Sequence, residues 1–121
     1  MHVRYTADHE WVMLVEDVAT VGVTDYAQRT LGELVFIELP VVGSTIARGA
    51  VAAVVESVKA ASDIFAPLSG SILAVNTAAV SDPPLVNTDP MGAGWLFKMQ
   101  WHQAGELSSL LDELEYQKLA K

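Results

Sequence analysis

The sequence predicts a mainly β fold, a β-sandwich or flattened barrel, for a chain of 121 residues. Two observations carry this prediction: short apolar stretches with alternating valines follow one another closely, and clusters of Gly, Pro, Asp and Ser separate them. The composition is that of a globular protein, because 51% of the residues are hydrophobic and 18% are charged. This length suits one core, so we expect a single domain over residues 1–121.

Strands make up most of the predicted elements. The first two, "WVMLVED" and "VATVGVT", are close enough to form a hairpin around Glu16 and Asp17. Pro40 ends the third strand, because proline cannot donate to a β-ladder. The predicted strands are Trp11–Asp17, Val18–Thr24, Glu33–Pro40 and Trp95–Trp101, with two further β-like stretches on either side of Lys59. The segment Ala78–Trp95, between the stretch that follows Lys59 and the strand that begins at Trp95, is rich in Pro, Gly and Asp and predicts a loop.

Helical signals occur in two places. In "TDYAQRTLG", Thr24 or Asp25 can cap the start of a short helix and Gly32 can end it. The C-terminal "GELSSLLDELEYQKLAK" predicts one or two amphipathic helices. We expect four leucines to share one face of this region: Leu107, Leu110, Leu111 and Leu114.

A weak internal repeat divides the chain at Lys59. "GELVFIEL…VGSTIARGAVAAVVES" and "GSILAVN…PPLVNTDPMGAGWLFKM" both contain a Gly-led strand, a turn and a second strand. If the repeat reflects a two-fold sandwich, the segment that joins the halves forms a hairpin tip, and Lys59 lies on it.

Charge and composition exclude several classes of function. The net charge of −8 would repel phosphate backbones, which argues against nucleic-acid binding. Without cysteine the chain has neither disulfides nor thiolate chemistry of its own. No apolar run is long enough to span a membrane, and the N-terminus lacks a signal-peptide pattern. We therefore expect a cytoplasmic bacterial protein, or a mitochondrial matrix protein if a leader has been removed.

Lys59 is the one basic residue in "VVESVKAASDIFAPLSG", Val54 to Gly70. It can be a solvated lysine at a strand edge, a buried Schiff-base lysine, or a modification site at an exposed tip. No glycine-rich phosphate-binding loop lies near it, and the two alanines that follow leave room for a modifying enzyme. Spacing alone does not decide among these interpretations.

Four ordered blocks of the sequence resemble the H protein of the glycine cleavage system. They are "YTADHEWV" (Tyr5–Val12), "VATVGVTDYAQRTLGELVFIELP" (Val18–Pro40), "VVESVKAASDIFAPLSG" (Val54–Gly70), and "LVN" with "GAGW" (Leu85–Asn87 and Gly92–Trp95). The C-terminal "EYQKL" also fits, so the resemblance extends over nearly the whole chain.

The resemblance implies a two-sheet antiparallel sandwich of the lipoyl/biotinyl type with added helices, and a lipoyl group amide-linked to Lys59 of the "ESVKA" motif. The implied function is that of a non-catalytic carrier. It takes an aminomethyl group from the decarboxylating P protein to the tetrahydrofolate-dependent T protein, and the flavoprotein L reoxidises the lipoyl arm. A lipoate-attaching enzyme is a further implied partner.

Three carboxylates are candidate site residues in addition to Lys59. Glu56 is either a solvated strand residue or a recognition element for the lipoate-attaching enzyme. Glu10 and Asp63 match family positions at a cleft that shelters the arm when it carries its aminomethyl group. Their charge suits the protonated amine, although Asp63 can equally be a turn-forming residue. Asp8 and Thr30 fall near the same predicted cleft without an assigned role.

Other readings stay open at this point. A lipoyl domain of a 2-oxo acid dehydrogenase is shorter and lacks the "HEW" block, and a biotin carrier usually has methionines beside its lysine. The remaining alternatives are a relay that donates lipoate to 2-oxo acid dehydrogenases and a non-catalytic binding module. The isolated histidines His2 and His102 have no ligand-like spacing, so we expect no metal site.

Overall fold

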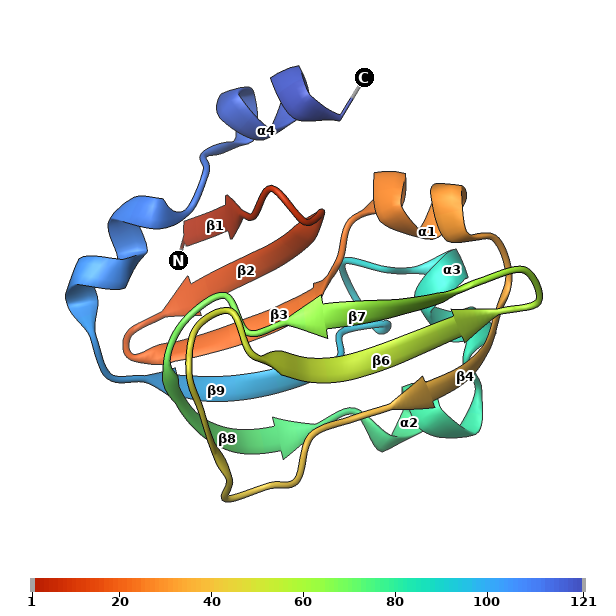
Figure 1. Cartoon of the computed structure of the whole chain (residues 1–121), viewed down its shortest axis with the longest axis horizontal. Coiled ribbons are helices and arrows are strands. Elements are labelled where there is room, and N and C mark those ends of the chain that lie inside the picture. Colours follow the sequence, from red (N-terminus) through yellow and green to blue (C-terminus); the bar gives the residue numbers. More distant parts are fainter. Residues whose placement is uncertain (1, 121) are drawn as a thin grey trace.

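The computed structural model describes residues 2–120 and places their strands in two antiparallel sheets (Figure 1). The six-stranded sheet has the order β1-β2-β3-β9-β8-β5, and the three-stranded sheet has the order β4-β6-β7. The strands are β1 His2–Tyr5, β2 Glu10–Val15, β3 Val18–Val23, β4 Leu34–Glu38, β5 Thr45–Ile46, β6 Val51–Ser57, β7 Ala61–Phe65, β8 Gly70–Val75 and β9 Phe97–Trp101. The expected two-sheet, mainly β architecture is confirmed.

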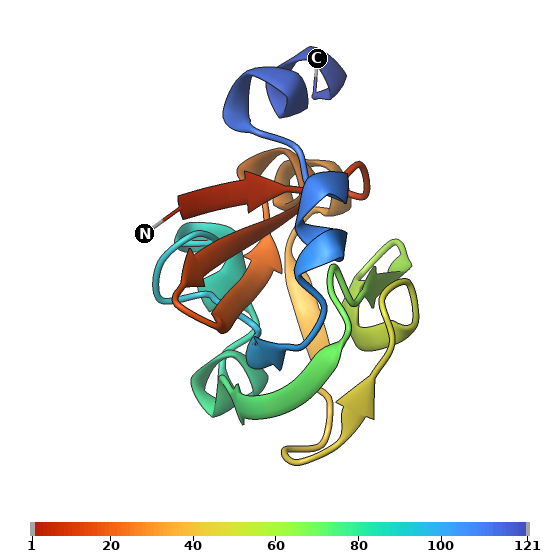
Figure 2. The ribbon, with the colours of Figure 1, turned by 90° about the vertical axis from the view of Figure 1, so that its left-hand side faces the viewer.

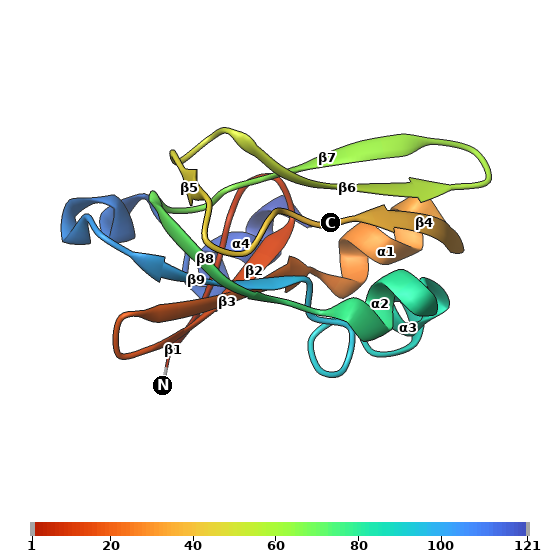
Figure 3. The same cartoon turned by 90° about the horizontal axis from the view of Figure 1, so that it is seen from below.

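Five short helical segments join or cover the strands. They are α1 Asp25–Leu31, α2 Thr77–Ser81, α3 Pro84–Thr88, α4 Glu113–Leu119 and a 3₁₀ helix at Ala104–Ser109. Viewed from below, the three-stranded sheet lies over the six-stranded sheet, and α2 and α3 lie beneath one end of β4 (Figure 3). Every helix within residues 2–120 is too short or too polar to cross a lipid bilayer.

The main core lies between the two sheets. Its fully buried side chains come from both layers, Val12, Val21, Phe97 and Met99 from the larger sheet and Leu34, Ile37, Val55 and Ile64 from the smaller one. Burial of each such side chain contributes roughly 1.5–3 kcal/mol. Because side chains alternate along a strand, Glu10 shares the core-facing side of β2 with Val12, at the rim of this core.

Helix α1 has the ends that its sequence predicts. The Oγ1 of Thr24 accepts a hydrogen bond from the backbone N–H of Ala27 at 3.3 Å, so Thr24 is the N-cap. Gly32 ends the helix with φ +87°, a left-handed conformation that favours glycine, and its N–H donates to the carbonyl of Gln28 at 2.9 Å. Of the two candidates Thr24 and Asp25, the structure selects Thr24.

Two predicted features are wrong. The expected loop 78–95 contains most of α2 and all of α3, five-residue helices too short to show a 3.6-residue apolar period. The leucine face in the C-terminal region does not exist, because the 3₁₀ helix ends at Ser109 and α4 begins at Glu113. Leu111 lies between them in a β-bridge to Tyr5, and Leu114 is 71% exposed.

The internal repeat corresponds to equivalent strand pairs. In the first half the Gly-led strand β4 pairs antiparallel with β6, and in the second half β8 pairs antiparallel with β9. The β6–β7 hairpin joins the two halves and carries Lys59 at its tip.

The C-terminal helix α4 stands at one end of the molecule, above β1 (Figure 2), and its Tyr116 attaches it to the body of the protein. Its hydroxyl lies 2.6 Å from the Oγ1 of Thr24 and 2.8 Å from the Nδ1 of His9, and its ring stacks on Tyr5 at 4.7 Å. Burial raises the pKa of this phenol above its ordinary value, so the hydroxyl keeps its proton as a donor. The same residue therefore positions α4, the start of α1 and the turn that precedes β2.

Replacing Tyr116 with phenylalanine is expected to lower the free energy of unfolding by about 1–2 kcal/mol, because two buried hydrogen bonds are lost while the ring stack is kept. Urea denaturation followed by circular dichroism measures the change. Tyr26→Phe is the matched control, since its ring contacts the same His9 but its hydroxyl has no recorded hydrogen bond within residues 2–120. Equal losses in the two variants would contradict the assigned role.

Candidate functional site

The tip of the β6–β7 hairpin is held by its backbone and by one serine. β6 ends at Ser57 and β7 begins at Ala61. The buried Ser57 Oγ accepts hydrogen bonds from the backbone N–H groups of Lys59 (3.3 Å) and Ala60 (3.2 Å), and its own N–H donates to the carbonyl of Ala60 at 2.8 Å. The turn is therefore fixed without use of the Lys59 side chain.

The Lys59 side chain is exposed at this tip, with small neighbours. A methyl group built on Gly32 would lie 3.5 Å from Lys59 Cε and 4.0 Å from Nζ, so the lysine stem passes over the glycine that ends α1. No hydrogen bond or ion pair to Nζ is recorded within residues 2–120. Val58 is 82% exposed, and Ala60 and Ala61 add little bulk. An acylating enzyme can therefore reach the amine, which fits a covalently attached group.

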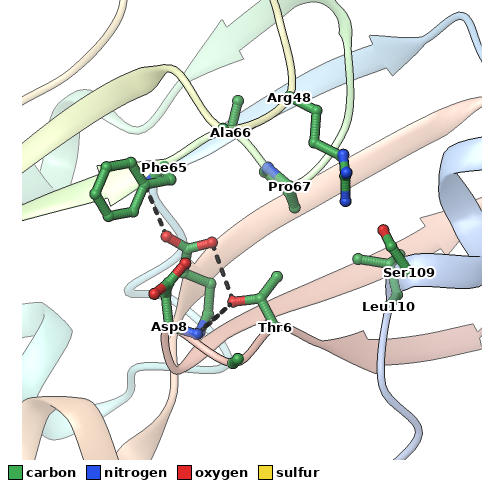
Figure 4. Close-up of a pocket in the computed structure, with 11 residues that line it drawn as sticks. Thr6, Asp8, Arg48, Phe65, Ala66, Pro67, Ser109 and Leu110 are labelled. Carbon is green, nitrogen blue, oxygen red and sulfur yellow. Dashed lines mark hydrogen bonds between the residues drawn. The ribbon is translucent and has the colours of Figure 1, made fainter.

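Glu10 lines a cleft of about 560 Å³. Figure 4 shows this cleft with eight of its other residues labelled. The Glu10 side chain is buried, and its two oxygens have separate donors: Oε2 accepts from the backbone N–H of Phe65 at 2.7 Å, and Oε1 accepts from Thr6 Oγ1 at 3.2 Å. Burial raises the pKa of Glu10 to about 7, the hydrogen bonds from Phe65 and Thr6 oppose this rise, and the charge of Asp8 adds to it. This carboxyl therefore exchanges its proton close to neutral pH.

Four separate segments line the cleft. They are the turn before β2, the loop before β6, the end of β7 and the end of the 3₁₀ helix. In Figure 4, Phe65 and Asp8 lie at one end and Arg48 and Ser109 at the other. The turn before β2 contains His9 at φ +64°, a left-handed conformation that is uncommon for a residue with a side chain. The carboxyl groups of Asp8 and Glu10 line this solvent-open space and can accept hydrogen bonds from a small polar cation, whereas the Arg48 guanidinium can only donate.

The structure places the predicted site residues in two groups. Glu10 and Asp8 line the cleft, whereas Asp63 is exposed on β7 and does not line it. Asp63 shares the outer side of β7 with Phe65, two residues further along, and so lies between Lys59 and the cleft along the strand. Thr30 does not line the cleft either; it belongs to a second hollow near Tyr26 and Ala120.

Glu56 lies on β6, paired with Phe36 of β4 on one side and Ala61 of β7 on the other. Ser57 ends β6 next to it, so the odd spacing between Glu56 and Lys59 is interrupted by the turn. Glu56 is partly exposed on the outer side of the sheet, close to the tip in sequence.

Sequence reasoning missed several residues of the cleft. Thr6 and the Phe65 N–H hold Glu10, and Arg48, Ser109 and Leu110 complete the lining. Only Thr6 had a local signal, a hydroxyl four residues before Glu10. The others come from distant parts of the chain. No group of three or more metal-binding side chains occurs in the part of the chain described, residues 2–120.

Comparison with known proteins identifies the family. The family model described as "Glycine cleavage H-protein" matches residues 3–121. The glycine cleavage system H protein of Methylacidiphilum infernorum is 57% identical over 115 residues, which cover 95% of this chain and 90% of that protein. The one from Thermotoga maritima is 53% identical over 114 residues, which cover 94% and 92%.

The fold agrees with this identification. The crystal structure of a glycine cleavage system H protein from Mycobacterium marinum superposes with a TM-score of 0.88 at 47% sequence identity, covering 96% of this chain and 94% of that one. The family match extends over nearly the whole length and includes both the hairpin tip and the cleft. The chain therefore belongs to the glycine cleavage H-protein family, the lipoyl carriers of the glycine cleavage system.

Proposed function

We propose that Lys59 is the lipoyl attachment site of this carrier. The observation that carries the proposal is the placement of Lys59, an exposed amine at the apex of a hairpin whose turn Ser57 holds without the lysine side chain. An amide bond from Nζ removes the lysine charge, and this costs the fold little because no ion pair to Nζ is recorded within residues 2–120. A bound lipoyl group supplies redox-active sulfurs, which this cysteine-free chain lacks.

We further propose that the protein carries the aminomethyl group from the P protein to the T protein and delivers electrons to the L protein. In this role Lys59 is an attachment point and the chain catalyses no step. A tether raises the local concentration of a bound group at each enzyme, which is the physical advantage of a carrier. Because the compared relatives are bacterial, we place the carrier in the bacterial cytoplasm.

Glu10, in the cleft, is proposed to hold the protonated amine of the aminomethyl group, and Asp63, outside the cleft lining, to hold it when the arm extends along β7. Each Glu10 oxygen has one recorded donor and can accept a second hydrogen bond. A cation within about 4–6 Å lowers a carboxyl pKa by roughly 1–3 units. With its pKa raised to about 7, Glu10 can therefore release its proton when the amine arrives. Asp63 lies along β7 between Lys59 and this cleft, and Glu56 is proposed as a recognition element for the lipoate-attaching enzyme.

Intact-mass spectrometry of protein from cells with active lipoylation tests the attachment. We expect an added mass of about 188 Da for a lipoyl amide, and peptide mapping of residues 54–65 should locate it on Lys59. The same adduct should be absent from Lys59→Ala. A bare Lys59 in such cells, or an adduct on another lysine, would overturn the proposal.

A further inference from the structure

The outer face of the three-stranded sheet has an ordered pattern of side chains. Register places Glu38 of β4, Val54 of β6 and Asp63 of β7 in one row across the sheet. The next row, nearer the Lys59 tip, contains Phe36, Glu56 and Ala61. Their inward neighbours Ile37, Val55 and Ile64 are buried in the core, so these two rows face outward.

Nothing else in the described chain covers this face. In Figure 1 the strands β6 and β7 lie in front of the rest of the molecule, and in Figure 3 they form its upper layer. Phe36 is 49% exposed although it is a large aromatic residue, and Val54 is partly exposed beside it. Exposed aromatic side chains next to polar ones are characteristic of protein-binding surfaces.

The charge on this face has one sign. The segments β4, β6 and β7 read "LVFIE", "VAAVVES" and "ASDIF", without lysine or arginine. The ion pair recorded within residues 2–120 joins Arg29 to Asp25 on α1, so no such pair neutralises Glu38, Glu56 or Asp63. A partner that fits this face would present basic groups around an apolar depression.

We propose that this outer face, Phe36, Glu38, Val54, Glu56 and Asp63, is the docking surface for the enzyme that attaches lipoate to Lys59. The proposal rests on the proposed function of Lys59. It extends recognition from Glu56 near the tip to β4, the far strand of the sheet. An enzyme that acylates Nζ must approach the hairpin tip, and this face continues from the tip without a break. Three paired strands hold this face rigid. Docking therefore immobilises few additional groups and costs little conformational entropy.

The two kinds of side chain have different effects on binding. Carboxylates at an interface mainly speed association with a basic partner, and this contribution weakens with salt. A partly buried aromatic residue such as Phe36 contributes through desolvation and slows dissociation. Neither kind touches the amine that reacts. Changes on the face should therefore raise KM for the carrier and leave kcat nearly unchanged.

The test measures steady-state lipoylation of the full unmodified chain by a purified lipoate-attaching enzyme with ATP and lipoic acid. For Glu38→Lys with Asp63→Lys we expect KM to rise about tenfold or more, and for Phe36→Ser about fivefold. The salt dependence of kcat/KM should be weaker in the double lysine variant than in the original chain. Circular dichroism confirms that each variant is folded.

The matched control is Glu16→Lys with Asp82→Lys, the same charge change on exposed residues outside the three-stranded sheet. Its KM should stay within about twofold of the original value. Failure of the original chain to accept lipoate on Lys59 would refute the proposed function. Lipoylation of Lys59 with KM unchanged in the face variants, or raised equally in the control, would refute the docking surface alone. So would a defect confined to assays with the P, T or L protein.

Discussion

Exchange of Lys59 for arginine is expected to abolish glycine cleavage in a system reconstituted with the P, T and L proteins. Arginine keeps the charge and much of the length, but a guanidinium stays protonated and does not form the amide that a lysine amine forms. The expected loss exceeds about 10³-fold and should reach the background rate, because without an arm on the hairpin tip this cysteine-free chain cannot carry the group between the enzymes. Turnover of glycine to a methylene-tetrahydrofolate product measures it.

The fold should be unaffected by the same exchange. Lys59 is exposed and its stem passes over Gly32, so the midpoint of thermal unfolding should change by less than about 2 °C. Lys118→Arg, an exposed lysine in the last turn of α4, is the matched control and should retain full turnover. Appreciable turnover by the Lys59→Arg protein would show that the arm is attached elsewhere.

Local signals explain which parts of the fold could be predicted. The β2–β3 hairpin, α1 with Thr24 and Gly32 at its ends, and the hairpin tip at Lys59 all depend on residues within a few positions of one another. Alternation, caps and turn residues act over this range. Short strands and turns recognised at this range predict a sandwich of two sheets. The pairing of β3 with β9 could not be predicted, because these strands are far apart in the sequence.

The errors have a physical cause as well. Leu107, Leu110, Leu111 and Leu114 have helical spacing, but Asp112 begins a new helix with a capping box to Glu115, and this interrupts the pattern. That signal was present in the sequence "DELE" and indicates a helix start at Glu113. In the segment 78–95, the prolines suggested a loop, although proline is favoured in the first turn of a helix such as α3.

The site divides in the same way. Lys59 could be proposed as the attachment site because its motif is contiguous, whereas the surroundings of Glu10 are assembled from segments that lie up to a hundred residues apart. The burial of Glu10 follows from its place at the rim of the core, which depends on how β7 packs beside β2. No local pattern contains that information. The raised pKa of Glu10 is therefore a property of the tertiary structure.

The free energy of unfolding should decrease as pH rises because of Glu10, and Glu10→Gln should remove this dependence. The folded pKa of about 7 lies above the ordinary value of 4.5, so the folded state holds the proton more tightly than the unfolded state. The contribution is complete below about pH 4.5 and is lost as pH rises through 7. Its size is about 3 kcal/mol at most, since each pKa unit corresponds to about 1.4 kcal/mol.

Urea denaturation of both proteins between pH 4 and 8 measures the effect. Glutamine keeps the shape and still accepts the hydrogen bond from Phe65, so the difference between the two proteins isolates the proton. We expect the original chain to lose about 2–3 kcal/mol relative to Glu10→Gln between pH 5 and 8. Glu38→Gln, at an exposed carboxylate, should differ from the original by less than about 0.5 kcal/mol throughout. A constant difference between the original and Glu10→Gln would contradict the raised pKa.

This cost to stability has a functional counterpart. A carboxyl that is fully ionised at neutral pH would attract any cation, whereas one with a pKa near 7 ionises fully when a cation enters the cleft. Addition of methylammonium, a small probe of the proposed occupant, should therefore stabilise the original chain more at pH 7 than it stabilises Glu10→Gln. At pH 4 methylammonium should have little effect on the stability of the original chain, because protonation of the Glu10 carboxyl removes the charge that binds the amine.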